Sequence, residues 1–196
     1  MNAVRDVTAP DADPLAEVLG RAFADDPLWQ WMFPRRPERM AAMFAMLLHH
    51  AHLPNGVSEL AEQDGRVLAG ALWDPPGRWR ISVATQLRQL PGMLRVLGTR
   101  TFAVMRALGE IEQAHPIEPH WYLAVLGTDP RAQGRGLGSA LLRSRLTRCD
   151  DLRFPAYLES SKESNIAYYE RFGFRVTGEI SVPGGPSVWA MWRNPQ

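Results

Sequence analysis

The sequence has few of the features that mark secreted, metal-stabilised or membrane proteins. Its 196 residues include one cysteine, Cys149, so no internal disulfide can form, and no Cys/His spacing resembles a structural zinc site. The longest apolar run, Met40 to Leu48, is far below the ~18–20 residues that a membrane helix needs. The N-terminal stretch carries acids and prolines where a signal peptide would carry an apolar run. We therefore expect a soluble, cytoplasmic protein.

The chain also lacks an excess of charge of either sign. Its 22 basic and 21 acidic residues leave a formal net charge of +1. Proteins that bind nucleic acid or anionic membranes through their overall charge carry a clear basic excess, so we expect neither partner. The remaining composition, 45% hydrophobic and 22% charged, is typical of a globular protein. We expect one domain over residues 1–196, as a monomer or a homodimer.

Hydrophobic periodicity predicts strands and helices that alternate along the chain. The expected strands are 3–8, 57–62, 66–74, 121–128, 156–159, 174–180 and 188–192. The expected helices are about 14–23, 37–52, 137–149 and 165–172, with a helical segment from Ile81 to His115 that is interrupted at Pro91-Gly92 and at Gly98. The aromatic segment from Leu28 to Pro34 is expected to be a loop. Alternating elements of this kind indicate an α/β fold around one mixed sheet.

A glycine-rich turn, residues 128–139, joins the continuous apolar strand 121–128 to an apolar helix. Glycines let the backbone approach a ligand closely, and a helix N-terminus offers unpaired N–H groups that suit phosphate. Arg131 and Arg135 could add charge-assisted contacts. The turn matches neither the GxxxxGK[ST] phosphate loop nor the GxGxxG dinucleotide motif. A purely structural strand-to-helix turn is the alternative.

Two motifs in the C-terminal half resemble those of the GNAT N-acetyltransferase superfamily. The run from Gln133 to Gly138 fits its first motif: Arg or Gln, two residues, Gly, one residue, Gly or Ala. The run from Asn165 to Phe174, NIAYYERFGF, is similar to its second motif, in the expected order and distance. Blocks between Pro119 and Trp192 are similar to the puromycin N-acetyltransferases in particular. The likeness is weak over residues 35–116, which would shape most of the acceptor pocket.

The resemblance implies a three-layer α-β-α sandwich with a mixed, twisted sheet and acetyl-CoA as acetyl donor. It places the pantetheine arm against the backbone of strand 121–128 and near Asn165, and the pyrophosphate on the glycine-rich turn. Tyr169 occupies the position of the superfamily's usual general acid, and a tyrosine suits a thiol leaving group. The implied cofactor-binding residues are Leu126, Gly127, Thr128, Arg131, Gln133, Gly134, Arg135, Gly136, Leu137, Gly138, Ser139 and Asn165.

An acceptor amine must lose a proton before it attacks, so a base is needed. Glu159, at the end of the strand expected beside the thioester, is the first candidate; a surface or salt-bridged carboxylate is the alternative. Glu179 is a weaker second candidate, counted with the residues expected to contact substrate.

Trp29, Trp31 and Phe33 could line an acceptor pocket, although core or interface positions are equally open. His49, His50 and His52 lack an acidic third ligand at useful spacing, so we expect solvated or capping histidines and no metal. Within the helical segment 81–115, the stretch from Leu87 to Ile111 could act as a lid or pair with a second subunit.

We therefore expect an acetyl-CoA-dependent N-acetyltransferase that acts on a primary amine of a small molecule. The resemblance to the puromycin N-acetyltransferases suggests an aminonucleoside-like or antibiotic amine. A protein acetyltransferase that takes an N-terminal or lysine amine is one alternative. A CoA-binding regulatory module without turnover is another.

Overall fold

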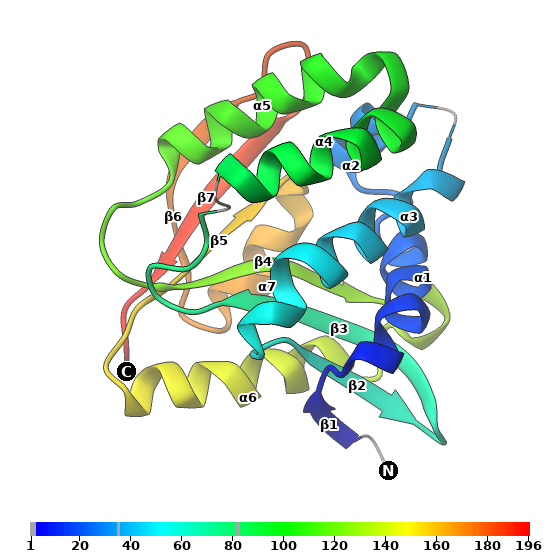
Figure 1. Cartoon of the computed structure of the whole chain (residues 1–196). Coiled ribbons are helices and arrows are strands. Elements are labelled where there is room, and N and C mark those ends of the chain that lie inside the picture. Colours follow the sequence, from blue (N-terminus) through cyan, green and yellow to red (C-terminus); the bar gives the residue numbers. More distant parts are fainter. Residues whose placement is uncertain (1–2, 35, 81–82) are drawn as a thin grey trace.

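The strands form one seven-stranded mixed sheet (Figure 1) in the computed structural model, which describes residues 3–34, 36–80 and 83–196. The strand order is β1-β2-β3-β4-β5-β7-β6. The strands are β1 Ala3–Asp6, β2 Glu59–Gln63, β3 Arg66–Asp74, β4 Trp121–Thr128, β5 Ala156–Ser160, β6 Arg175–Ser181 and β7 Ser187–Arg193. Only the central pair, β4 and β5, is parallel among these strands; the other neighbours are antiparallel.

Helices cover both faces of this sheet. They are α1 Ala12–Ala22, α2 Pro27–Met32, α3 Glu38–Leu47, α4 Val83–Leu97, α5 Thr101–Ala114, α6 Leu137–Asp151 and α7 Ile166–Glu170. Buried residues of α6 and α7 pack with Trp73 and Leu158 on one face. Buried residues of α1 to α5 pack with Leu72 and Val125 or with Tyr157 on the other. Figure 1 shows α6 below the sheet and the α4–α5 hairpin above it. The expected three-layer α-β-α sandwich is confirmed.

The aromatic segment after α1 forms a helix, α2, where the sequence predicted a loop. Asp26 accepts hydrogen bonds from the amides of Leu28 and Trp29, at 3.0 and 3.1 Å, and Pro27 occupies the first helical position. An aspartate followed by proline is a strong helix start, and this signal outweighs the poor helix propensity of the aromatic residues. The two tryptophans are thereby held in a fixed relation to each other.

The helical segment before β4 is one hairpin, and of the two predicted interruptions only the one at Gly98 is present. Pro91 lies inside α4 without ending it, and the chain breaks at Gly98, whose φ is +60°. A Cβ atom at Gly92 would lie 3.0 Å from Sδ of Met46 on α3, so this glycine permits close helix packing instead of a turn. The expected start at Ile81 lies outside the described residues.

Helix 37–52 is also irregular at its end. The α-helix stops at Leu47, and residues 48–52 form a turn of π-helix followed by the short 3-10 helix Leu53–Asn55. No helix among the described residues has the length and apolarity needed to span a membrane.

Candidate active site

The two parallel strands at the centre of the sheet separate part-way along their length. Pairing of β4 with β5 runs only from Trp121 opposite Ala156 to Leu123 opposite Leu158. Beyond this point β4 stays paired with β3 as far as Thr128, and β5 with β7 as far as Ser160. The inner edge of β4 therefore presents backbone N–H and C=O groups to a widening gap, where an extended ligand can pair with them.

Three residues on the free part of β4 were predicted to contact the cofactor, and their side chains have different surroundings. A Cβ atom at Gly127 would lie 2.8 Å from Cδ2 of Leu19, so this glycine lets α1 approach the strand. Leu126 packs against the core on the α6 side. The hydroxyl of Thr128 lies 3.4 Å from the place of a Cβ at Gly138. The strand is thus held on both faces while its inner edge stays open.

The glycine-rich turn follows directly and leads into α6. Gly134 and Gly136 have φ values of +77° and +78°, and no atom lies within 4 Å of a Cβ placed on either. Backbone conformation, not crowding, therefore requires glycine here. No side chain caps α6, so its first N–H groups point out of the helix end without an intrahelical partner.

Charged and polar side chains surround this helix end. Arg131, Gln133 and Arg135 are exposed, and the Arg135 guanidinium donates to the carbonyl of Arg131 at 3.0 Å. Neither arginine forms an ion pair with a carboxylate in the described part of the chain. The open amides, the positive end of the helix dipole and the two guanidinium groups together suit a pyrophosphate group.

Two adjacent tyrosines of α7 face this region in different ways. The Tyr168 hydroxyl lies 3.4 Å from Oγ of Ser139 at the start of α6. Tyr169 is 8% exposed and packs in the core cluster that includes Leu123 and Leu158, where β4 and β5 part. Burial raises the pKa of Tyr169, with smaller contributions from Tyr168 and the charge of Asp26. Its phenol therefore stays protonated at neutral pH.

Asp26 is a buried carboxylate that the sequence analysis did not select. It is 7% exposed, and the Ser161 hydroxyl, one residue beyond β5, donates to it at 2.7 Å. Burial raises the pKa of Asp26, although the Ser161 hydroxyl and the two α2 amides partly oppose this. Next to it, Lys162 pairs with Asp25. The α1–α2 connection is thus attached to the residues after β5, across the mouth of the gap. The Asp-Pro pair was the sequence signal for this cap.

Glu159 lies at the point where the strands separate. It is the first residue of β5 beyond the pairing with β4, and its side chain is 7% exposed. Its Oε1 atom lies 3.2 Å from Nδ1 of His115, which follows α5 directly. Tyr122 and Tyr157 lie nearby, and burial followed by the charge of Glu159 raises the pKa of both phenols. The structure therefore puts Glu159 in an aromatic and histidine-lined site on the α5 face, not on the protein surface.

A model of the acetyltransferase (GNAT) family matches residues 21–174. The chain belongs to the GNAT family. An uncharacterised N-acetyltransferase of Schizosaccharomyces pombe is 28% identical over 186 residues, which cover 88% of this chain and 74% of the relative.

Solved structures of GNAT proteins share the fold over the full chain. A protein from Corynebacterium glutamicum, named histone acetyltransferase HPA2 and related acetyltransferase, is 27% identical and has a TM-score of 0.77, covering 100% of this chain and 97% of its own. The polyamine N-acetyltransferase of Drosophila melanogaster has a TM-score of 0.71 at 19% identity, covering 99% and 100%. Arylalkylamine N-acetyltransferase 2 of Aedes aegypti has a TM-score of 0.72 at 17% identity, covering 100% and 99%. None of these relatives is a puromycin N-acetyltransferase, so the narrower likeness stays a prediction.

The aromatic residues that this GNAT protein was expected to place around an acceptor occupy different environments. Trp29 is 9% exposed and stacks on Phe44, with ring centroids 4.0 Å apart, so it belongs to the core. Phe33 is buried as well. Trp31 is only half-buried and lies beneath the Arg100 guanidinium, 4.7 Å from its ring centroid. Of the three, Trp31 alone presents a partly accessible ring.

A pocket of about 350 Å³ opens beside this aromatic segment. Its lining includes Phe33 from the segment itself and Leu97 and Arg100 from the end of the α4–α5 hairpin. Glu179 lies elsewhere, on the exposed side of β6. The structure therefore does not bring Glu179 together with the pocket.

The histidines after α3 differ from expectation at one position. His49 and His50 are exposed, and His49 lies 3.4 Å from a carboxylate oxygen of Asp13. His52 was expected to be solvated or capping, but it is 6% exposed and bonds Asp74 at 3.1 Å through Nδ1. The π-helical turn directs this side chain toward the end of β3. No group of three or more metal-ligating side chains occurs within residues 3–34, 36–80 and 83–196.

Proposed function

We propose that this GNAT protein transfers the acetyl group of acetyl-CoA directly to a primary amine of a small molecule. The observation that carries the proposal is the parting of β4 and β5 after Leu123 and Leu158, with the glycine turn at one side of the gap and Tyr169 and Glu159 beside it. An open strand edge next to an uncapped helix end accommodates a long arm that terminates in a diphosphate.

The residues present fit such a donor. The N–H groups at the start of α6 and the positive φ at Gly134 and Gly136 form a backbone cradle for phosphate. The free edge of β4 from 124 to 128 offers N–H and C=O groups to the pantetheine arm, and Asn165 keeps its amide free of a capping bond. When bound, acetyl-CoA supplies the acetyl group as a thioester. N–H groups on the β4 edge would polarise the thioester carbonyl.

Side chains on the two faces of the gap accept and donate the protons of the reaction. Glu159 accepts a proton from the substrate ammonium, whose nitrogen keeps the electron pair and forms the new C–N bond. Tyr169 gives its hydroxyl proton to the departing sulfur as the C–S bond breaks. After the C–N bond has formed, the nitrogen loses a second proton, which reprotonates the phenolate of Tyr169. One proton is therefore released to solvent in each turnover.

Glu159 is preferred to Asp26 as the base because of their contacts. Asp26 accepts two α2 amides and the Ser161 hydroxyl, so its oxygens are engaged in capping and in holding the α1–α2 connection. Glu159 contacts the ring nitrogen of His115 and interacts with the phenols of Tyr122 and Tyr157, and none of these contacts is needed to cap a helix or to hold a connection. Buried sites of mixed polarity of this kind are where catalytic carboxylates occur.

The substrate class is supported by the partly accessible Trp31 and by the small amines named for the fold relatives. Isothermal titration with acetyl-CoA, with ATP and NAD as controls, should give saturable binding of acetyl-CoA alone. Thiol release should then be measured with agmatine, a polyamine, an arylalkylamine, puromycin and a peptide with a free N-terminus. Turnover of the peptide but no small amine would favour the protein acetyltransferase alternative. Binding without any turnover would favour the regulatory module.

Two isosteric variants test the choice of base. Glu159→Gln should lower kcat by about 10²-fold or more, because the amide cannot take a proton. Asp26→Asn should keep most of the activity, since asparagine caps helices as well as aspartate does. A large loss of kcat in Asp26→Asn, with Glu159→Gln active, would transfer the role of base to Asp26. Unchanged melting temperatures would show that either effect is chemical.

A further inference from the structure

Behind Glu159, two buried histidines continue the hydrogen-bonded chain. His115 Nδ1 lies 3.2 Å from Glu159 Oε1, and His115 Nε2 lies 2.9 Å from His120 Nε2. His120 Nδ1 lies 2.6 Å from the backbone carbonyl oxygen of Glu118. His115 and His120 are 6% and 1% exposed. Three groups from residues 115–120 thus form one line with Glu159, from the strand gap to the loop before β4.

The carbonyl at the end of this line fixes the protons along it. A carbonyl oxygen only accepts, so His120 must carry its proton on Nδ1. Burial lowers the pKa of His120, which keeps this ring neutral and leaves Nε2 as an acceptor. His115 must then donate from its own Nε2 to His120. The second nitrogen of His115, Nδ1, consequently faces Glu159 either as a lone pair or with one further proton.

One proton fits between Glu159 and His115. Without it, a carboxylate and a ring lone pair would face each other 3.2 Å apart in a buried site, which is unfavourable. With it, the two groups share one hydrogen bond, in which either can be the donor. The unprotonated pair therefore favours uptake of one proton from a bound amine, which is the task of a base.

The groups that surround this pair are mostly aromatic rings. On β4 and β5 the nearest titratable groups are Tyr122 and Tyr157, whose rings lie edge-on to His115 at 4.8 and 4.7 Å and whose pKa values are raised. Trp79 stacks on His115 at 3.6 Å, with the Arg80 guanidinium on its ring. Trp192 of β7 lies edge-on to His120.

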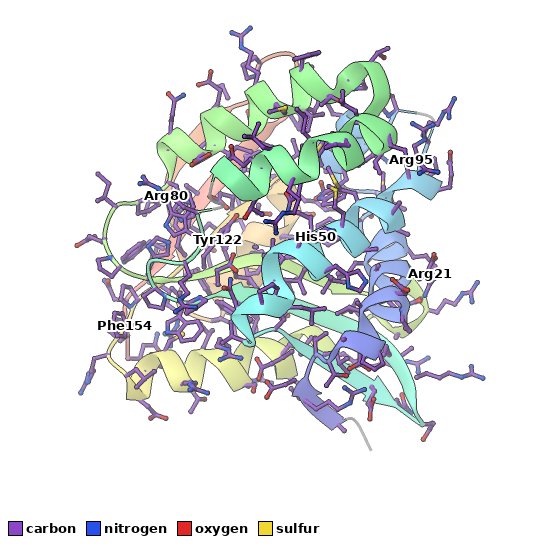
Figure 2. All side chains as sticks on the ribbon, viewed as in Figure 1. Arg21, His50, Arg80, Arg95, Tyr122 and Phe154 are labelled. Carbon is purple, nitrogen blue, oxygen red and sulfur yellow. The ribbon has the colours of Figure 1, made fainter. Side chains whose placement is uncertain are left out.

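The remaining charges lie further along these elements. Asp74 at the end of β3 is bonded to His52 and Asn55, and the Glu118 side chain is exposed on the loop. Figure 2 shows Tyr122 and Arg80 in the same region of the molecule, far from Arg21 beside α1. The Glu159–His115 pair is thus enclosed mainly by neutral rings.

We propose that Glu159 and His115 act as a single base that accepts one proton from the substrate amine, and that His120 is the positioning residue that fixes the His115 tautomer. The amine N–H bond breaks, its electron pair stays on nitrogen, and the proton ends between the Glu159 oxygen and His115 Nδ1. His120 transfers no proton; its Nδ1–H stays on the Glu118 carbonyl. The inference rests on the proposed function for its catalytic meaning, but the tautomers can be measured without substrate.

Histidine ¹⁵N NMR of the unliganded protein reads these tautomers directly. At pH 8 His120 should be the Nδ1–H tautomer, the opposite of the Nε2–H form common in solution, and His115 should carry a proton on Nε2. In Glu159→Gln the amide should donate to His115 Nδ1, and His115 should remain the neutral Nε2–H tautomer. His50, exposed after α3, serves as the control, and its ¹⁵N resonances should be the same in both proteins. An Nε2–H tautomer at His120 would overturn the proposal.

Kinetics of matched variants give an independent reading. His120→Gln keeps one donor and one acceptor and should retain most of the activity, whereas His120→Phe keeps only the ring and should lower kcat by about 10–100-fold with KM for acetyl-CoA unchanged. In His115→Asn the amide donates to Glu159, so the acidic limb of the kcat–pH profile should move toward lower pH by about one unit or more. Equal activity of the Gln and Phe variants, or an unmoved limb, would contradict the proposal.

The outcomes separate this inference from the proposed function. Predicted tautomers without acetyl transfer to any amine would remove the proposed function and leave the hydrogen-bonded unit in place. Acetyl transfer by a protein whose His120 is the Nε2–H tautomer would support the proposed function and remove the hydrogen-bonded unit. If His120→Phe does not fold, the NMR measurement on the wild-type protein still decides.

Discussion

The two sides of the strand gap are built in contrasting ways. On the side of α6 and α7, the groups proposed to contact a ligand are backbone amides and glycines within two short segments, residues 128–139 and 165–174. On the side of α2, α4 and α5, they are side chains brought together from distant segments. Asp26 meets Ser161 across 135 residues, and His115 meets Glu159 across 44. The first side suits a ligand of constant structure, while the second can change its ligand through single substitutions.

This difference separates two kinds of binding. Backbone amides recognise phosphate and an extended arm irrespective of most side chains, so they restrict sequence only at the glycines. Side-chain sites select shape and charge, and they depend on the packing that holds each residue. Substitutions on the first side should therefore change affinity for the donor. Those on the second should change turnover and amine choice.

The largest effect is expected at Tyr169, a side chain on the side of α6 and α7. Tyr169→Phe should lower kcat by about 10²–10⁴-fold and leave the dissociation constant of acetyl-CoA nearly unchanged, because only the acidic hydroxyl is lost. Stopped-flow thiol release and isothermal titration measure the two quantities. The neighbouring Tyr168→Phe is the matched control and should keep kcat within the same order of magnitude. Full activity in Tyr169→Phe would remove its role as the acid.

The next largest effect is expected at the two tryptophans of α2, and it shows which of them contacts the amine. Trp29→Ala should destabilise the protein by about 3–5 kcal/mol, since the ring is buried against Phe44. Trp31→Ala should instead raise KM for the amine by about 2–10-fold at nearly constant stability. Thermal unfolding and initial rates distinguish the two. If the KM for the amine rises in Trp29→Ala but not in Trp31→Ala, Trp31 does not line the acceptor pocket.

The smallest effect concerns the backbone cradle. Gly136→Val forces a branched residue into a left-handed conformation that costs about 1–2 kcal/mol, so acetyl-CoA affinity should fall by about 5–30-fold. Gly56 has a similar φ of +65° and equally open surroundings, but it lies after α3. Gly56→Val should cost stability without changing affinity. Equal loss of affinity in both variants would show that strain, not the turn, controls binding.

The sequence predicted the features that depend on short local segments, but not the contacts between side chains from distant segments. The position of the glycine turn before α6 and the bounds of β3 and β4 could be predicted because their signals are local: glycine spacing and short apolar runs between turn residues. The mixed sheet followed from the alternation of periods, and the three layers from the resemblance to the GNAT superfamily. The role of Tyr169 stays a prediction. The His115–His120 chain and the Asp26–Ser161 contact could not be predicted, because periodicity shows which face a residue occupies but not its partner across the fold.

Errors at the helices have a physical cause as well. The Leu28–Pro34 segment was expected to be a loop because the family resemblance places an acceptor loop there, and Asp25-Asp26-Pro27 was interpreted only as the end of the preceding helix; Asp26-Pro27 also begins a new one. Pro91 was expected to break a helix that continues to Leu97. His52 was expected to be exposed or capping because the π-helical turn that rotates it inward has no local sequence signature.

The single cysteine has a practical consequence for chemical labelling. Cys149 lies fully buried on α6, and burial raises the pKa of its thiol to about 12. A buried thiol that stays protonated reacts slowly with disulfides and maleimides. Reagents that report free thiols in an assay mixture would then detect liberated coenzyme and not the protein. A cysteine engineered onto the exposed face of α5 would be a unique attachment point for a fluorophore without removal of the native one.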